Sequence, residues 1–202
     1  MTSSEIKICK PFQEGIYFSC EMCGGCCKGF DEGEVFLYSD DLARLIKYLN
    51  VKQRKYNLKK FAREYLKLVD TSFYWKEPGA KRGKNYNFQA LGFKFIGKDE
   101  HCEFLDQNNT CTVHEARPFQ CKAFPIGWNM LIASFSKFKN YSRKCPALRK
   151  SLKGKGQYFS KEKILAWAKK EYEMEKEFFL KMKNHDFDIF KVYPFLPKDI
   201  DC

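Results

Sequence analysis

Eight of the ten cysteines lie in two groups, and this clustering constrains the chain more than any other feature. The first group has a Cys-x2-Cys-x2-Cys-Cys spacing and comprises Cys20, Cys23, Cys26 and Cys27. The second is more widely spaced and comprises Cys102, Cys111, Cys121 and, further along, Cys145. Two cysteines with two residues between them can reach the same ion, and four close thiolates bind a soft or borderline cation tightly. The sequence therefore predicts a fold organised around metal.

The glycines and the adjacent pair in the first group indicate how the metal is arranged. Gly24 and Gly25 let the backbone turn sharply around a small ion. In an extended backbone, Cys26 and Cys27 would point to opposite sides. This geometry favours two four-ligand sites, or one bridged polynuclear cluster, over a single ion with spare thiols.

Helix signals surround the later cysteines. Pro118 is well placed at the first position of a short helix, which puts Cys121 in its first turn, and Phe124-Pro125 would end that helix. At a helix start the positive end of the dipole stabilises a thiolate. Cys145 precedes another stiff residue, Pro146.

The remaining thiols and histidines have simpler interpretations. Cys9 and Cys202 are isolated and are expected to be small buried hydrophobes or idle surface thiols. His101 and His114 flank ligand cysteines and could coordinate or donate hydrogen bonds to the ligands, although eight thiols already suffice for two tetrahedral sites. Whether either histidine coordinates stays open.

Residue patterns predict an α+β fold. The chain has 202 residues, 44% of them hydrophobic and 17% aromatic, which is enough for the core of one small domain. Apolar spacing predicts a helix that Ser39 begins, a second over about 58–69 and a long C-terminal helix over about 160–184. Short strands are expected over 16–19, 35–38, 71–96 and 128–138, with a bulge near Ala90–Gly92 where the apolar alternation slips by one residue.

We expect a single domain over residues 1–202. Its metal-binding region covers residues 18–146, and residues 157–202 form the long helix and a docked apolar tail. The stripe expected to be buried on the long helix comprises Leu165, Ala168, Tyr172, Phe179 and Met182. On the same helix, Glu177 and Lys181 form a favourable pair, whereas Glu171 and Glu175 repel each other.

Charge and composition limit the partners and the location. The formal net charge of +12 suits an acidic partner such as nucleic acid, although no nucleic-acid recognition motif accompanies it. Residues 1–17 carry no secretory signal, and no apolar stretch is long enough to cross a membrane. A cytoplasmic location is therefore expected, where cysteines serve more often as metal ligands or redox groups than as disulfides.

These motifs together resemble the CxxCxxCC cysteine-cluster family (YkgJ-like proteins), which is described as zinc- or iron-chelating. The resemblance covers about residues 18–146, through Cys20-x2-Cys23-x2-Cys26-Cys27, Cys102-x-Phe104-Leu105-Asp106, Cys111-x-Val113-His114-x2-Arg117-Pro118-x2-Cys121 and Cys145-Pro146. It implies that all eight clustered cysteines bind zinc or iron, with an iron–sulfur cluster as a variant. A similar cysteine pattern occurs in longer flagellin lysine N-methylases.

Three functions follow as hypotheses. The chain is a metal-binding structural or interaction module, an iron or iron–sulfur enzyme that acts on protein in the manner of a lysine N-methylase, or a basic zinc protein that binds nucleic acid. The sequence leaves open whether it is an enzyme.

Overall fold

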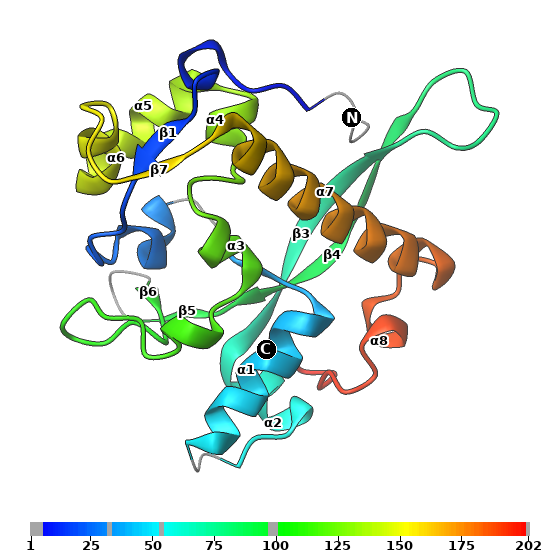
Figure 1. Ribbon diagram of the computed structural model, residues 1–202. Coiled ribbons are helices and arrows are strands. Elements are labelled where there is room, and N and C mark those ends of the chain that lie inside the picture. Colours follow the sequence, from blue (N-terminus) through cyan, green and yellow to red (C-terminus); the bar gives the residue numbers. More distant parts are fainter. Residues whose placement is uncertain (1–5, 32–33, 53–54, 97–100, 201–202) are drawn as a thin grey trace.

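The fold comes from a computed structural model that describes residues 6–31, 34–52, 55–96 and 101–200 (Figure 1). It is an α+β fold of short antiparallel strands and helices that ends in a long C-terminal helix, as the sequence predicted. Cys202, which we expected to be idle, lies outside the described residues. No helix in the described ranges has the length and apolarity needed to span a membrane.

A three-stranded antiparallel sheet forms the centre of the molecule. Its strand order is β2 (Phe36–Leu37), β4 (Lys84–Phe93) and β3 (Leu66–Trp75). The β3–β4 register runs without interruption from Leu66 opposite Phe93 to Trp75 opposite Lys84. The predicted bulge near Ala90–Gly92 is therefore wrong. Residues 90–93 are buried without a break because both faces of β4 are covered at this end, where Ala90, Leu91 and Phe93 belong to the hydrophobic core.

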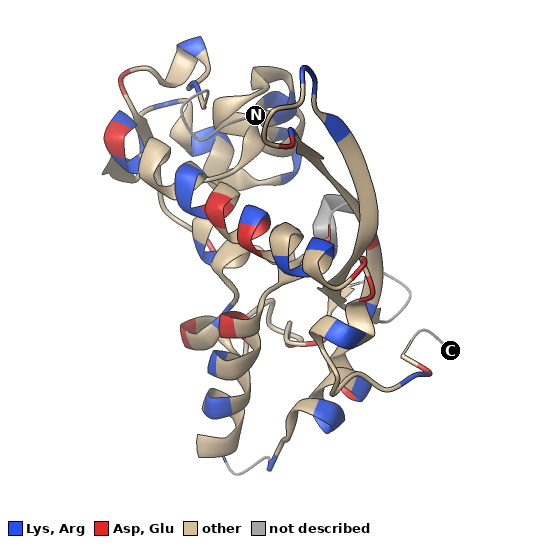
Figure 2. Ribbon diagram, turned by 90° about the vertical axis from the view of Figure 1, so that its right-hand side faces the viewer, with Lys and Arg blue, Asp and Glu red and all other residues tan. Residues whose placement is uncertain are grey.

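Two helices lie between β2 and β3 in the sequence. Helix α1 (Ser39–Val51) has a buried face formed by Leu42, Leu45 and Leu49, as the apolar spacing predicted. Figure 2 shows acidic residues at its start and basic residues further along. Tyr38, and not Ser39, precedes the helix as its cap. Helix α2 (Leu58–Tyr65) stops four residues short of the predicted end, because Leu66 is already the first residue of β3.

The long helix α7 (Lys161–Asn184) lies across the β3–β4 hairpin (Figure 1). Ser160 caps its start by accepting a hydrogen bond from the Lys163 amide. Phe179 is fully buried and stacks on Phe73 of β3, with the ring centroids 4.8 Å apart. Ala168 and Met182 are buried as predicted, whereas Leu165 and Tyr172 of the predicted stripe are only partly buried. The adjoining residues Ile164 and Phe178 are buried instead.

The C-terminal tail and the ion pair expected on α7 are both present. Glu177 and Lys181 form an ion pair of 3.2 Å. After α8 (Ile189–Val192), Tyr193 and Leu196 are buried, so the tail is docked on the body as expected. Figure 2 shows acidic and basic residues interspersed along α7.

The segment from residue 128 to 138 is helical, so the strand predicted there is wrong. It forms α4 (Asn129–Ile132) and the first part of α5 (Phe135–Lys144). Ser134 separates the two helices and caps α5 by accepting a hydrogen bond of 3.4 Å from the Lys137 amide. A local cap outweighs the β-propensity of the aromatic residues here.

Buried side chains form two separate hydrophobic clusters. The first joins the sheet to α1, α2, α7 and the C-terminal tail. The second joins the N-terminal segment and strand β1 (Ile16–Phe18) to α4, α5, α6 (Pro146–Ser151) and the start of α7. Strand β1 pairs with β7 (Gln157–Phe159) at the edge of the second cluster. The cysteines lie where these two clusters meet.

Candidate metal centre

One cavity of about 90 Å³ collects all the predicted ligands. Its lining includes the eight clustered cysteines, Cys20, Cys23, Cys26, Cys27, Cys102, Cys111, Cys121 and Cys145. Cys102 and Cys145 are buried, four others are half-buried, and Cys20 and Cys23 are exposed at the rim. Cys9 is not part of this lining and packs against the second hydrophobic cluster, as expected for an isolated cysteine.

The adjacent pair lies in a helical turn, which overturns the argument for opposite-facing thiols. Cys26 and Cys27 belong to the 3-10 helix η3 (Gly25–Asp31), and their thiols are hydrogen-bonded to each other. The expectation of opposite sides assumed an extended backbone. Gly24 begins the turn at φ +75°, a conformation that glycine adopts readily, and the Cys27 amide bonds back to its carbonyl at 2.9 Å. Both thiols therefore line the same cavity.

The later cysteines come from three separate elements. Cys102 ends β6 (His101–Cys102), which pairs with β5 (Phe95–Ile96), and Cys111 forms a β-bridge with Leu105. Cys145 stands between α5 and α6, with Pro146 as the first residue of α6.

Cys121 lies in the first turn of the short helix α3 (Phe119–Ala123), as predicted. Pro118 is one residue earlier than expected, as the cap and not the first helical residue. The helix ends just before Phe124-Pro125, which agrees with the predicted stop.

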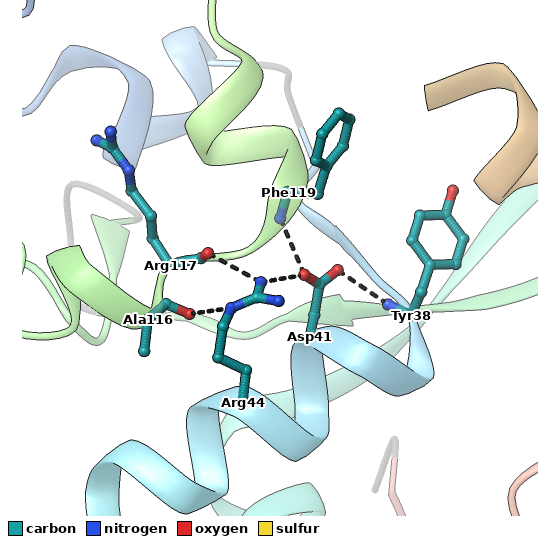
Figure 3. A network of polar contacts seen from close by, with 6 residues as sticks. All are labelled: Tyr38, Asp41, Arg44, Ala116, Arg117 and Phe119. Atoms are coloured by element: carbon teal, nitrogen blue, oxygen red, sulfur yellow. Dashed lines mark hydrogen bonds and ion pairs between the residues drawn. The ribbon is translucent and has the colours of Figure 1, made fainter. Parts of the chain in front are cut away.

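A buried ion pair that sequence reasoning missed holds α3 in place (Figure 3). Asp41 of α1 is 1% exposed, and its carboxylate accepts hydrogen bonds from the Phe119 amide at 2.9 Å and from the Arg44 guanidinium. Arg44 also donates to the carbonyl oxygens of Ala116 and Arg117. Helix α1 therefore holds in place the segment of chain that leads into Cys121. The only sequence signal was an acidic residue in the first turn of a helix, which is ordinary.

Backbone amides point at several of the sulfurs. The Met22 amide donates to Cys20 Sγ at 3.4 Å, and backbone hydrogen bonds from Phe104 and Val113 reach the sulfurs of Cys102 and Cys111. In each case the donor is two residues after the cysteine. Cys145 receives such bonds from Leu148 and Ala147. The bonds to Cys102, Cys111 and Cys145 lower the thiol pKa because they favour the charged form, so they are suited to thiolate ligands.

Burial, and repulsion between neighbouring thiolates, raise the pKa of several thiols and so oppose the effect of the amide hydrogen bonds. Burial raises the pKa of the Cys121 thiol well above its usual value, and nearby Cys102, Cys26 and Cys111 raise it further. Burial likewise raises the pKa of Cys102 to about 12, with Cys111 and Cys26 adding to the effect. The hydrogen bond with Cys27, followed by burial, raises the pKa of Cys26. Four thiols are thus close enough to repel one another as thiolates, and they are Cys26, Cys102, Cys111 and Cys121.

A second set of thiols adjoins the first. Burial raises the pKa of Cys145 to about 11, and Cys23 and Cys26 contribute. Cys26 therefore interacts with both sets. Arg117, which also lines the cavity, acts against these shifts at Cys26, Cys111 and Cys121. A bound cation would act in the same direction as Arg117, but from within the cavity and more strongly.

The donor set fits a soft or borderline metal. Among the residues that the structure describes, the nine cysteines are free thiols, and no three Cys, His, Asp or Glu side chains already converge as closely as a bound ion requires. The thiols instead surround a space of about 90 Å³, and a water-sized occupant needs only about 10–15 Å³ of such space. Eight thiols around one cavity, several of them with amide donors, match the needs of zinc or of iron in a cluster.

The two histidines differ in their positions. His114 lines the cavity, but its Nε2 is 2.8 Å from an Arg117 guanidinium nitrogen and accepts a hydrogen bond from it. Burial, and then Arg117, lower the pKa of His114. His101 precedes Cys102 on β6 and does not line the cavity.

Comparison with known proteins agrees with this centre. No solved structure matches the chain. The family model CxxCxxCC, described as a "putative zinc- or iron-chelating domain", matches residues 19–185. The match begins at the first cysteine group and extends beyond residue 146, through all of α7. The chain therefore belongs to the CxxCxxCC family of zinc- or iron-chelating domains.

Proposed function

We propose that this protein holds zinc or iron through its eight clustered cysteines. One observation carries the proposal: thiols from segments as far apart as residues 20 and 145 line one cavity. Unpaired thiols are costly to place together, because each thiolate raises the pKa of the others. A cation in the cavity reverses that cost, since metal binding favours the thiolate form.

The ligands divide into an inner and an outer group. The inner group is Cys26, Cys102, Cys111 and Cys121, whose thiols repel one another and are half-buried or buried. The outer group is Cys20, Cys23, Cys27 and Cys145, which lines the same cavity; of these, Cys20 and Cys23 are exposed at its rim and Cys145 is buried. Cys26 adjoins both groups, so we propose two neighbouring metal positions, or one polynuclear cluster, with Cys26 between them. The sequence led to the same two alternatives from an extended Cys26-Cys27 backbone. They now depend on the position of Cys26 between the two groups.

The first role of the metal is to join the two hydrophobic clusters. Cys102 is buried in the first cluster, and Cys27, Cys111 and Cys121 pack against it. Cys145 is buried in the second cluster, and Cys26 packs against that one. A metal bound by both sets of thiols would link the two clusters, so its binding free energy would contribute to folding.

A catalytic or redox iron centre is the second candidate function. The exposed rim at Cys20 and Cys23 favours it, because a small reactant could approach the centre there. Iron with an open coordination position would supply redox or group-transfer chemistry, whereas zinc closed by four thiolates would be structural.

Metal content of matched variants tests the proposal. We expect Cys121→Ser to lose bound metal, while Cys9→Ser, which makes the same change outside the cavity, keeps the wild-type content. Proteins purified anaerobically are compared by elemental analysis and absorption spectra. Equal metal content in the two variants would contradict the proposal, and a brown, iron-containing wild type would favour the second candidate function.

A further inference from the structure

A second and larger cavity lies beside the cysteine centre. It has a volume of about 640 Å³ and is enclosed by α7, β3, β4 and the segments around β2 and from α3 to α5. This volume is within the range of sites for small molecules. Aromatic side chains form much of its wall, namely Phe36, Phe73, Tyr74, Trp128, Tyr141 and Tyr172.

Three carboxylates line this aromatic cavity in a chain whose net charge is +12. Glu171 and Glu175 are one turn apart on α7, and Glu34 faces them from the segment before β2. Glu34 Oε1 pairs with Lys67 at 2.7 Å, while its buried Oε2 has no hydrogen-bond partner among the described residues. Lys137 is the one basic side chain in the lining. The cavity therefore carries an excess of negative charge when its carboxyls are ionised.

Among the residues that the structure describes, no basic side chain offsets the raised pKa of Glu171 or of Glu175. Burial, and then repulsion from Glu175, raise the pKa of Glu171 to about 8. Desolvation raises the pKa of Glu175 to about 7, even though part of this residue is exposed. A cation placed between them would lower both values and be held in return. This repulsion is the Glu171–Glu175 opposition that the sequence indicated.

We propose that this cavity binds a small organic cation, a molecule with one ammonium or guanidinium group on an apolar body. The cationic group would lie between the carboxylates of Glu171 and Glu175, which can accept charge-assisted hydrogen bonds from it. The apolar body would lie against the aromatic wall, where Trp128, Tyr141 and Tyr172 offer ring faces or edges to a cation and to apolar groups. An inorganic cation would leave most of this wall and volume unused.

The cavity shares a wall with the cysteine centre. Glu34 and Trp128 line both cavities, and the Trp128 indole N–H donates at 3.1 Å to the carbonyl oxygen of Gln120, the residue before Cys121. A ligand in the larger cavity would therefore contact the wall that separates it from the thiols. The proposal itself depends only on the larger cavity, so it holds or fails independently of which metal the cysteines bind.

Calorimetric titration of the protein as purified tests this proposal with matched probes. 2-Phenylethylamine carries one ammonium on an apolar ring, and 2-phenylethanol has the same size without the charge. We expect saturable binding of the amine with one site per chain and at least about tenfold weaker binding of the alcohol, as a charge-assisted contact predicts. Equal binding of the two probes, or no saturable binding of the amine, would overturn the proposal.

Variants on α7 locate the site. Glu171→Gln with Glu175→Gln should weaken amine binding at least about tenfold, because two charge-assisted hydrogen bonds are lost. Glu173→Gln is the control, since Glu173 pairs with Lys176 on the same helix and does not line the cavity. Circular dichroism verifies that each variant is folded. If the double variant does not fold, the single variants Glu171→Gln and Glu175→Gln are measured in its place. Binding reduced equally in the control, or unchanged in every Glu171 and Glu175 variant, would refute the assignment.

Discussion

The buried carboxylate of Asp41 connects the stability of the fold to the geometry of the metal centre. Asp41→Asn keeps the size of the side chain and removes its charge. The Asp41 carboxylate accepts hydrogen bonds from Arg44, from the Phe119 amide at 2.9 Å and from the Tyr38 amide at 3.3 Å (Figure 3). An amide in its place presents one donor NH2 group to this set of donors, so at least one of them loses its acceptor.

The size of the stability loss depends on how deeply the Asp41–Arg44 ion pair is buried. Removing one partner of a fully buried ion pair costs about 3–5 kcal/mol. The Asp41 side chain is 1% exposed, but that of Arg44 is 35% exposed and keeps part of its hydration. We therefore expect a somewhat smaller loss of about 2–4 kcal/mol in the free energy of unfolding. In a chain of this length, each kcal/mol lowers the melting temperature by about 2–4 °C.

Urea denaturation and thermal melting measure this loss, with Asp40→Asn as the matched control. Asp40 lies in the same first turn of α1 and is exposed, so its change should stay within about 0.5 kcal/mol. Metal content is measured in both variants, because the network positions the segment that leads to Cys121. A cost for Asp41→Asn no greater than that for Asp40→Asn would refute the reasoning.

Two further predictions concern α7. Phe179→Ala should cost about 3–5 kcal/mol in the free energy of unfolding, since Phe179 is fully buried against Phe73. The control is Phe190→Ala, at a side chain that is 37% exposed, which should cost less than half as much. Equal costs in denaturant titrations would contradict the packing of α7 on the sheet. The protein should also lose stability as the pH rises from 5 to 8, because the pKa of Glu171 and of Glu175 is raised in the folded state to about 8 and about 7, from 4.5. Their stabilising effect is complete below the unfolded value and is lost as the pH passes the folded values. The double variant Glu171→Gln, Glu175→Gln should show a smaller fall in melting temperature over that pH range than the wild type. Glu34 and Lys137, the other charged side chains that line the cavity, remain in this variant. A pH profile identical to that of the wild type would disprove this assignment.

The cysteine cluster could be predicted better than the fold around it. Cysteine spacing identified the eight cysteines that line the cavity, because clustered cysteines are recognised by type and spacing. The long helix from Ser160 was also predictable, since a cap and a long apolar stripe agree. These features depend on local signals that the surrounding structure does not override.

The errors have a common cause in tertiary context. Residues 90–93 look like a slip in alternation because the sequence does not reveal that both faces of β4 are buried at this end. Residues 128–138 have strand-like composition, yet the Ser134 cap and packing in the second cluster make them helical. Cys26-Cys27 was read as extended, whereas η3 is helical. The Asp41–Arg44 network joins residues more than 70 positions apart, and no spacing rule indicates such a contact.

X-ray absorption at the metal edge of anaerobically purified protein tests the central claim most directly. The proposal predicts stoichiometric zinc or iron with a first shell of sulfur, at about 2.3 Å if the metal is zinc. Replacement of Cys121 or Cys102 by serine should reduce the metal content or the number of sulfur neighbours, while Cys9→Ser should leave both unchanged. A first shell dominated by oxygen or nitrogen, or a protein that takes up neither zinc nor iron under reducing conditions, would contradict the claim.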